Sequence, residues 1–273
     1  MRTLELAGVP VPVIGQGTWR MGEDPRQRTR EIAALRTGID LGMTLIDTAE
    51  MYAEGGAEEV VGEAIAGVRD RVFLVSKVYP HNASQRGIPL ACERSLRRLG
   101  TDYIDLYLLH WRGQFPLAET VDAFERLRDD GKIGRWGVSN FDVADLHELG
   151  SDACATNQVL YNLEERGIEF DLLPWCQQQR MPLMAYCPIA QAGSLLFEPT
   201  LKQIAARLNV TAAQVSLAWI LRQDGVIAIP KAVHPEHVQL NAAAGELKLD
   251  AEDLQALDRA FRAPSRKHRL AMV

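Results

Sequence analysis

Four side chains suited to proton transfer follow successive apolar runs of the chain. Asp47 lies five residues before Tyr52, Lys77 comes after the next apolar run, and His110 after the one beyond it. A phenol is a weak acid at neutral pH, and a neighbouring ammonium group such as that of Lys77 is expected to lower its pKa. Asp47 could hold the lysine charged, and His110 could orient a carbonyl beside the Tyr52 hydroxyl. This set predicts reduction of a carbonyl group with Tyr52 as general acid, provided that a hydride donor lies opposite.

Predicted strands, which would position these residues, alternate with predicted helices along the chain. Short apolar runs rich in β-branched residues begin near positions 13, 44, 72, 103, 133, 154, 182 and 226. Most of them are separated by about 30 residues, the length that one strand-helix-strand unit needs. Between them, apolar residues recur at three- and four-residue steps, which is typical of amphipathic helices. The pattern predicts an α/β fold with eight parallel strands.

Eight such units without a Pro/Gly/Ser-rich linker favour a closed (β/α)8 TIM barrel, a single domain over residues 1–273. An open doubly wound sheet is the alternative. The long link before the eighth run has room for two helices, the second beginning at a capping box from Thr211. An extra C-terminal helix is expected after Asp250. On the helix before Gly100, Arg94, Arg97 and Arg98 are predicted to form a solvated outer face.

In a barrel the chemistry lies at the carboxyl ends of the strands. Here the residues that follow the apolar runs are polar or aromatic. An unpaired charge in a barrel mouth is unfavourable. The gathering of these polar and charged residues at one rim therefore predicts a functional site in which they are paired, rather than eight unrelated polar loops. These residues are Thr18, Trp19, Asp47, Thr48, Ser76, Lys77, His110, Trp111, Ser139, Asn140, Asn157, Gln158, Tyr186 and Lys231.

Eight motifs resemble those of the aldo-keto reductases and occur in that family's order over nearly the whole chain. They are Gly-Thr-Trp at 17–19, Asp-Thr-Ala-Glu-Met-Tyr at 47–52, Val-Ser-Lys-Val at 75–78, Leu-Leu-His-Trp at 108–111, Gly-Val-Ser-Asn-Phe at 137–141, Asn-Gln-Val at 157–159, Ala-Tyr-Cys-Pro-Ile at 185–189 and Ile-Pro-Lys at 229–231. The resemblance implies a barrel with an N-terminal β-hairpin cap. It also implies that Asp47, Tyr52, Lys77 and His110 form a catalytic tetrad.

The cofactor that this resemblance implies is NADPH, bound in an extended pose without a Rossmann fold. Tyr186 would stack on the nicotinamide ring, and Ser139, Asn140 and Gln158 would bind its carboxamide. The full set of implied cofactor contacts is Thr18, Trp19, Asp47, Ser139, Asn140, Gln158, Tyr186, Cys187, Pro188, Ile189, Lys231, Ala232, His237 and Asn241.

The adenosine end of this implied site departs from the family pattern. Ala232 and His237 stand where relatives commonly have Ser and a phosphate-binding Arg. An Arg is always charged, whereas a His with a pKa of about 6.5 is mostly neutral at neutral pH. Lys231 and Asn241 remain, and Pro235 is expected to open a helix whose N-terminal amides favour an anion. NADPH is therefore still preferred over NADH.

Aromatic and apolar residues near the tetrad are expected to wall a substrate pocket. The loop from His110 to Pro116 is short, and few residues follow Phe261, so we expect an uncovered mouth that suits small polar aldehydes. The chain is similar to short bacterial family members that reduce methylglyoxal and other 2-oxoaldehydes, which implies a role in aldehyde detoxification. The predicted pocket residues are Trp19, Met51, Tyr52, Tyr79, His110 and Trp111.

Composition excludes several other classes of function. A net charge of -6 disfavours nucleic acid as a partner, and no apolar run is long enough to span a membrane. Four cysteines without a C-x-x-C pair, and no secretion signal, indicate a reduced, cytoplasmic protein. His234 and His237 lack a third metal ligand, so no metal site is predicted. The expected partner is a small carbonyl compound, and no pattern fixes an oligomeric state.

Two other functions stay open at this stage. The chain could be a regulatory barrel that binds the nucleotide with little turnover. It could instead use Lys77 as the Schiff-base lysine of an aldolase-type barrel, with Asp47 and Tyr52 as proton shuttles. Borohydride would trap a carbonyl substrate on Lys77 in the aldolase and not in a reductase.

Overall fold

Ten strands form a small hairpin and one large parallel sheet in the computed structural model, which describes residues 1–273. The hairpin pairs β1 (Thr3–Leu6) with β2 (Val9–Pro12) in antiparallel register. The sheet follows chain order throughout. Its strands are β3 (Gln16–Gly17), β4 (Leu45–Asp47), β5 (Phe73–Val78), β6 (Ile104–Leu109), β7 (Ile133–Ser139), β8 (Cys154–Leu160), β9 (Leu183–Tyr186) and β10 (Val226–Ala228).

The first and last strands of this sheet meet. Ile14, two residues before β3, forms a parallel bridge with Ala228 at the end of β10. The Gly15 amide donates to the Ala228 carbonyl at 2.9 Å, and the Gly17 amide donates to the Pro230 carbonyl at 3.0 Å. These bonds close the sheet, so the predicted (β/α)8 barrel is confirmed and the open doubly wound alternative is wrong.

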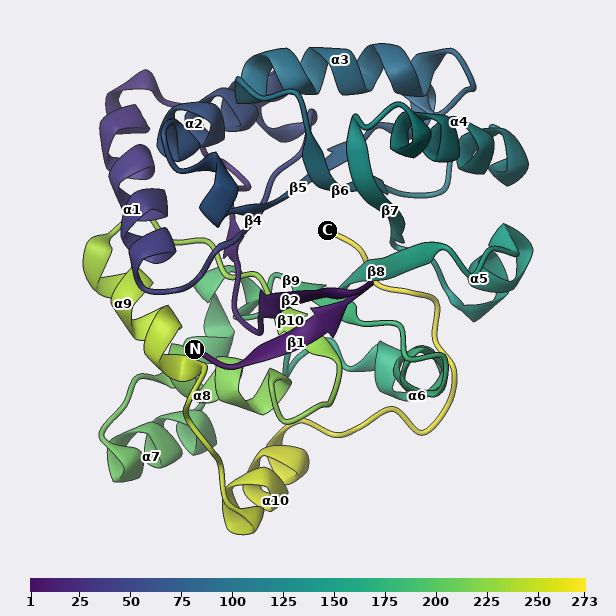
Figure 1. Cartoon of the computed structure of the whole chain (residues 1–273). Helices are drawn as coiled ribbons and strands as arrows, with labels where there is room; N and C mark the ends of the chain where they lie inside the picture. The colour runs from purple at the N-terminus through teal and green to yellow at the C-terminus, as the bar shows by residue number, and fades with distance from the viewer.

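Helices surround the strands on all sides (Figure 1). They are α1 (Arg28–Asp40), α2 (Gly56–Ile65), α3 (Gly87–Leu99), α4 (Leu117–Asp129), α5 (Val143–Leu149), α6 (Leu172–Gln178), α7 (Pro199–Leu208), α8 (Ala212–Ile220), α9 (Pro235–Ala244) and α10 (Ala251–Ala260). The long link before β10 holds α7 and α8, and α8 begins at the capping box of Thr211. α10 is the predicted extra helix and begins at the capping box of Asp250. None of the helices has the length and hydropathy that a bilayer crossing requires.

Two apolar cores leave one end of the barrel open for chemistry. The larger, of 59 buried residues, lies between the strands and the helices, and a core of 11 fills the barrel interior. Leu6 and Val11 of the hairpin belong to the interior core, so the hairpin closes the amino-terminal end. Along β5, Phe73 and Val75 face inward, and the strand alternation therefore also turns Lys77 inward toward the opposite mouth.

The expected solvated face of α3 is wrong for Arg98, whose side chain is only 21% exposed. Arg98 binds Glu58 with Nε to Oε2 at 2.6 Å, and Arg94 approaches Glu50 at 3.4 Å. Arg97 is exposed as expected, and the Arg94 side chain also remains 41% exposed. Both glutamates are buried, and a buried carboxylate needs a hydrogen-bonded or charged partner. For Arg98, the buried Glu58 overrides the solvent preference of the side chain.

The expectation that the residues after Phe261 leave the mouth uncovered is also wrong. Met272 and Val273 line the cavity at the carboxyl ends of the strands. The segment 262–273 therefore runs back from α10 across the barrel, and its end lies within the ring of strands in the view of Figure 1. Lys267 holds this segment by ion pairs to Asp171 at 3.0 Å and Asp142 at 3.7 Å.

Candidate active site

The Lys77 ammonium group lies at the centre of a buried hydrogen-bond network. Its Nζ donates to Asp47 Oδ2 at 2.8 Å, to the Thr48 carbonyl at 2.9 Å and to Tyr52 Oη at 3.0 Å. β4 ends at Asp47, β5 carries Lys77, and a short 3-10 turn begins at Tyr52. A lysine ammonium has three hydrogens, and each has an acceptor here. Tyr52 is the acceptor in its bond to Lys77, so its own proton is free to be donated elsewhere.

Burial controls the protonation of this pair. It raises the pKa of Tyr52 well above 10, with a further rise from the charge of Asp47. Burial also lowers the pKa of Lys77, against the opposing effect of Asp47. The expectation that Lys77 lowers the pKa of Tyr52 is therefore wrong, because desolvation of the phenolate dominates. The hydroxyl keeps its proton at neutral pH, which is the form that a general acid requires.

His110 follows β6 and faces the tyrosine. The two rings meet edge to face, with their centroids 5.8 Å apart. Burial lowers the pKa of His110 well below 6.5, and the Lys77 charge lowers it further. The imidazole is thus neutral at pH 7 and carries one N–H. Its Nδ1 is buried without a hydrogen-bond partner. A carbonyl oxygen between the two rings could accept one hydrogen bond from His110 and one from Tyr52.

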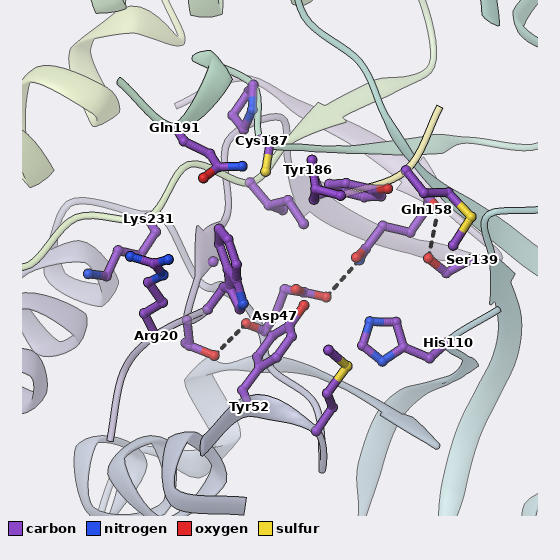
Figure 2. Close-up of a pocket in the computed structure, with 18 of the residues that line it drawn as sticks. Arg20, Asp47, Tyr52, His110, Ser139, Gln158, Tyr186, Cys187, Gln191 and Lys231 are labelled. Atoms are coloured by element: carbon purple, nitrogen blue, oxygen red, sulfur yellow. Dashed lines mark hydrogen bonds between the residues drawn. The ribbon is translucent and has the colours of Figure 1, made fainter. Parts of the chain in front are cut away.

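Asp47 is also held from the far side of the barrel. The Gln158 side-chain amide on β8 donates to Asp47 Oδ1 at 2.7 Å (Figure 2). Beside it, the Tyr186 hydroxyl donates to Asn140 Oδ1 at 2.9 Å, and Asn140 Nδ2 donates to the His110 carbonyl at 3.1 Å. The residues predicted to hold a nicotinamide group therefore already contact the predicted tetrad.

These groups open into one cavity of about 640 Å³ at the carboxyl ends of the strands. That volume is within the range of about 300–1,000 Å³ typical of small-molecule sites. In the view of Figure 2, Arg20 and Lys231 lie at one end of the cavity and His110 at the other. Neither of these two cations forms an ion pair with a carboxylate of the chain. The cavity thus combines an anion-binding end with a proton-donating end.

The comparisons with known proteins agree with this geometry. The family model described as "Aldo/keto reductase family" matches residues 13–262. The chain is 60% identical over 273 residues to methylglyoxal reductase YeaE of Escherichia coli, covering 97% of this chain and 96% of that protein. The chain belongs to the aldo/keto reductase family. Membership confirms the predicted enzyme class, an NAD(P)H-dependent oxidoreductase acting on carbonyl groups.

Two further relatives of this aldo/keto reductase are informative. A glyoxal reductase of Bacillus subtilis is 38% identical, with 92% of this chain and 89% of that protein covered. A crystal structure of an aldo/keto reductase from Klebsiella pneumoniae in complex with NADP and acetate is 57% identical. It superposes with a TM-score of 0.98 and covers 100% of this chain and 99% of that chain.

Most residues predicted to contact cofactor or substrate line the cavity of this reductase. Those that line it are Thr18, Trp19, Asp47, Met51, Tyr52, His110, Trp111, Ser139, Asn140, Gln158, Tyr186, Cys187, Pro188, Ile189 and Lys231. Lys77 lies beneath the cavity floor and reaches it through Tyr52. Tyr79 is not part of the lining, and its ring packs edge to face on Trp111 with the centroids 5.9 Å apart.

The adenosine end is less well defined in this reductase. Ala232, His237 and Asn241 do not line the cavity. α9 does begin at Pro235, as predicted, with His234 at its N-cap position. The His234 and His237 rings meet at 5.4 Å on the exposed surface of that helix, which places them beyond the cavity rim.

Several lining residues were missed from the sequence. They are Gly17, Arg20, Gln191, Ala192, Ile229, Met272 and Val273. Arg20 could have been found, because it directly follows two predicted rim residues after the first strand. Its backbone is left-handed with φ 66°, and its guanidinium lies over the Trp19 ring, 5.0 Å from the centroid. Met272 and Val273 carry no local signal, because the apolar run 270–273 is too short to show a helix or strand period.

Proposed function

We propose that this chain reduces small aldehydes and 2-oxoaldehydes such as methylglyoxal to alcohols, with NADPH as the reductant and Tyr52 as the general acid. The observation that carries this proposal is the bond from Lys77 Nζ to Tyr52 Oη at 3.0 Å. Tyr52 Oη accepts this bond from Lys77, which lies beneath the cavity floor. The phenolic proton of Tyr52 is therefore left to be donated to an acceptor in the cavity. His110 adds a second, neutral donor to the same carbonyl oxygen, as an oxyanion site requires.

The cavity residues fit the cofactor. Tyr186 offers an aromatic face, and the side chains of Ser139 and Asn140 offer hydrogen-bonding groups beside it. Arg20 and Lys231 offer two cations that are not paired with a carboxylate of the chain, which suits the phosphates of a dinucleotide. When bound, NADPH supplies the hydride that the carbonyl carbon accepts. The chain contributes the proton from Tyr52 and holds the carbonyl for both transfers.

The substrate class follows from the walls beside Tyr52 and His110. Met51 directly precedes Tyr52, Trp111 packs on His110, and Trp19 and Met272 line the same cavity. A pocket of this kind suits a small molecule with one polar end. The names of the Escherichia coli and Bacillus subtilis relatives, methylglyoxal reductase and glyoxal reductase, support the same class. We further propose a cytoplasmic location, supported by four free cysteines.

The test is nicotinamide absorbance with methylglyoxal as substrate and either NADPH or NADH. We expect turnover with NADPH, and we expect Tyr52→Phe to lower kcat by about 100-fold or more, because removal of a general acid costs about 10²–10⁴-fold. Cofactor binding by Tyr52→Phe, followed by fluorescence titration, should be unchanged. Turnover that survives this substitution would refute the role of Tyr52. Binding without turnover on any aldehyde would support the regulatory barrel instead.

The aldolase alternative is disfavoured by the position of Lys77. A Schiff-base lysine must present its Nζ to the substrate carbonyl. Lys77 does not line the cavity, it is fully buried, and its three hydrogens are bound by Asp47, Thr48 and Tyr52. Borohydride with methylglyoxal should leave the peptide that carries Lys77 unmodified, and an adduct on Lys77 would revive this reaction.

A further inference from the structure

The turn that carries Tyr52 has an unfavourable backbone conformation. It is a 3-10 turn, Tyr52–Gly55, that joins β4 to α2. Ala53 and Glu54 are left-handed, with φ 51° and 53°, and Gly55 follows with φ 95°. Residues with a Cβ adopt this conformation only where surrounding contacts hold it. The position of the Tyr52 hydroxyl therefore depends on what anchors the two ends of the turn.

Glu50 anchors the first end. It is 7% exposed and lies two residues before Tyr52. Its Oε1 accepts from the Tyr79 amide at 2.8 Å and from Asn82 Nδ2 at 2.9 Å. Its Oε2 lies 3.4 Å from the Arg94 guanidinium on α3. Glu50 thus ties the start of the turn to the segment that follows β5.

Glu58 anchors the other end. It is fully buried in the first turn of α2, directly after the left-handed segment. Its Oε1 accepts from Ser76 Oγ at 2.6 Å, and its Oε2 accepts from Arg98 Nε at 2.6 Å. Arg98 also covers Gly55, where a Cβ would lie 2.4 Å from the arginine Nε. The glycine is therefore required both by its φ and by the arginine packed on it.

Both anchors converge on the strand of the catalytic lysine. Ser76 directly precedes Lys77 on β5, and the Tyr79 amide lies two residues beyond it. Arg94 and Arg98 are four residues apart on α3, so they share one face of that helix and reach both glutamates. The Tyr52 turn is thus fixed to β5 and α3 at each end, by two carboxylates that the proton transfer itself does not use.

We infer that Glu50 and Glu58 are positioning residues that set the Tyr52 hydroxyl against Lys77. The inference rests on the proposed role of Tyr52. Loss of either ion pair would let the left-handed turn relax, and Tyr52 would move away from both Lys77 and His110. The affinity for NADPH should be preserved, because neither glutamate lines the cavity.

Glu58→Gln tests this inference, with Glu63→Gln as matched control on the same helix, where Glu63 forms an exposed ion pair with Arg28. We expect Glu58→Gln to lower kcat with methylglyoxal by about 10-fold, from loss of aligned proton donation. The dissociation constant for NADPH should stay unchanged, and the control should match wild type. In a Tyr52→Phe background, Glu58→Gln should cause no further loss, because both changes act on the same proton. Losses that multiply in the double variant would overturn the inference.

Two further measurements keep the test decisive. If Glu58→Gln does not fold, Ser76→Ala removes a single bond to Glu58, and unchanged kcat in Ser76→Ala would then count against the inference. With tyrosines replaced by 3-fluorotyrosine, the ¹⁹F resonance absent from Tyr52→Phe reports the position of this ring without turnover. We expect that resonance to shift or broaden in Glu58→Gln and not in Glu63→Gln. A wild type without turnover would refute the proposed function, whereas an unshifted resonance would refute the positioning role.

Discussion

Gln158 and Asp47 are 111 residues apart, and the Gln158 side-chain amide donates to Asp47 Oδ1 at 2.7 Å across the barrel mouth. Asp47 Oδ2 accepts from Lys77 at 2.8 Å, so both carboxylate oxygens are bound. A change at Gln158 therefore reaches the tetrad directly, in addition to any effect on the nicotinamide group.

Gln158→Glu is expected to be more damaging than Gln158→Ala at pH 7.5. The glutamate would face Asp47 at hydrogen-bond distance, and two adjacent carboxylates raise the pKa of one of them. At lower pH one carboxyl takes a proton and the bond to Asp47 can form again. We expect the activity of Gln158→Glu relative to Gln158→Ala to rise between pH 7.5 and pH 5.5 in kcat/KM profiles. A ratio that is constant with pH would contradict this reading.

His110 should make stability depend on pH below neutrality. Burial lowers its folded-state pKa well below 6.5, whereas the unfolded value is about 6.5. Below pH 6.5 the unfolded chain therefore binds the extra proton first, and stability falls as the pH falls. The loss attributable to this group is up to about 2 kcal/mol between pH 6.5 and 5.0.

The measurement is the free energy of unfolding from urea titrations at pH 7.5 and 5.0. His110→Asn should lose less stability than wild type over this interval. His237→Asn, which removes an exposed imidazole, serves as control and should follow wild type. If His110→Asn and wild type lose the same amount, His110 is not held neutral by burial.

Cys187 should react slowly despite lying at the cavity. Burial raises the pKa of its thiol to about 11, so little thiolate exists at neutral pH. We expect slow alkylation by iodoacetamide at pH 7.5, with a rate that rises through pH 9, followed by peptide mass spectrometry. Cys187→Ser should keep activity within about 2-fold, since a small polar side chain replaces a protonated thiol. Rapid labelling at pH 7 would show that the thiolate is stabilised by a group not seen in this arrangement.

Lys267 should affect substrate selection more than stability. It is 47% exposed and pairs with Asp171 at 3.0 Å, and such exposed pairs contribute about 0–1 kcal/mol. Lys267→Met should free the segment that carries Met272, which raises KM for methylglyoxal and lowers KM for bulkier aldehydes. Lys248→Met, an exposed lysine without an ion pair, is the control. Equal KM values for both variants and wild type would show that the segment does not select substrates.

The sequence alone determined the order and nature of the elements. Apolar runs about 30 residues apart fixed the eight strands, and capping boxes at Thr211 and Asp250 fixed the starts of two helices. Most of the cavity was predictable for the same reason, since alternate residues at the carboxyl ends of barrel strands face the mouth, whereas the predicted rim residues Thr48, Ser76 and Asn157 do not line the cavity. Asp47 and His110 follow this rule, because strand periodicity is a local property.

Only the tertiary structure decided how these residues are held. The C-terminal segment that carries Met272 is held by ion pairs from Lys267 to Asp142 and Asp171, which lie more than 90 positions away in the chain. The inward turn of Arg98 depends on a buried carboxylate on another helix. Likewise, burial rather than the neighbouring ammonium sets the protonation of Tyr52. Desolvation and long-range charge pairing depend on which segments pack together. The local sequence pattern does not indicate which distant segments those are.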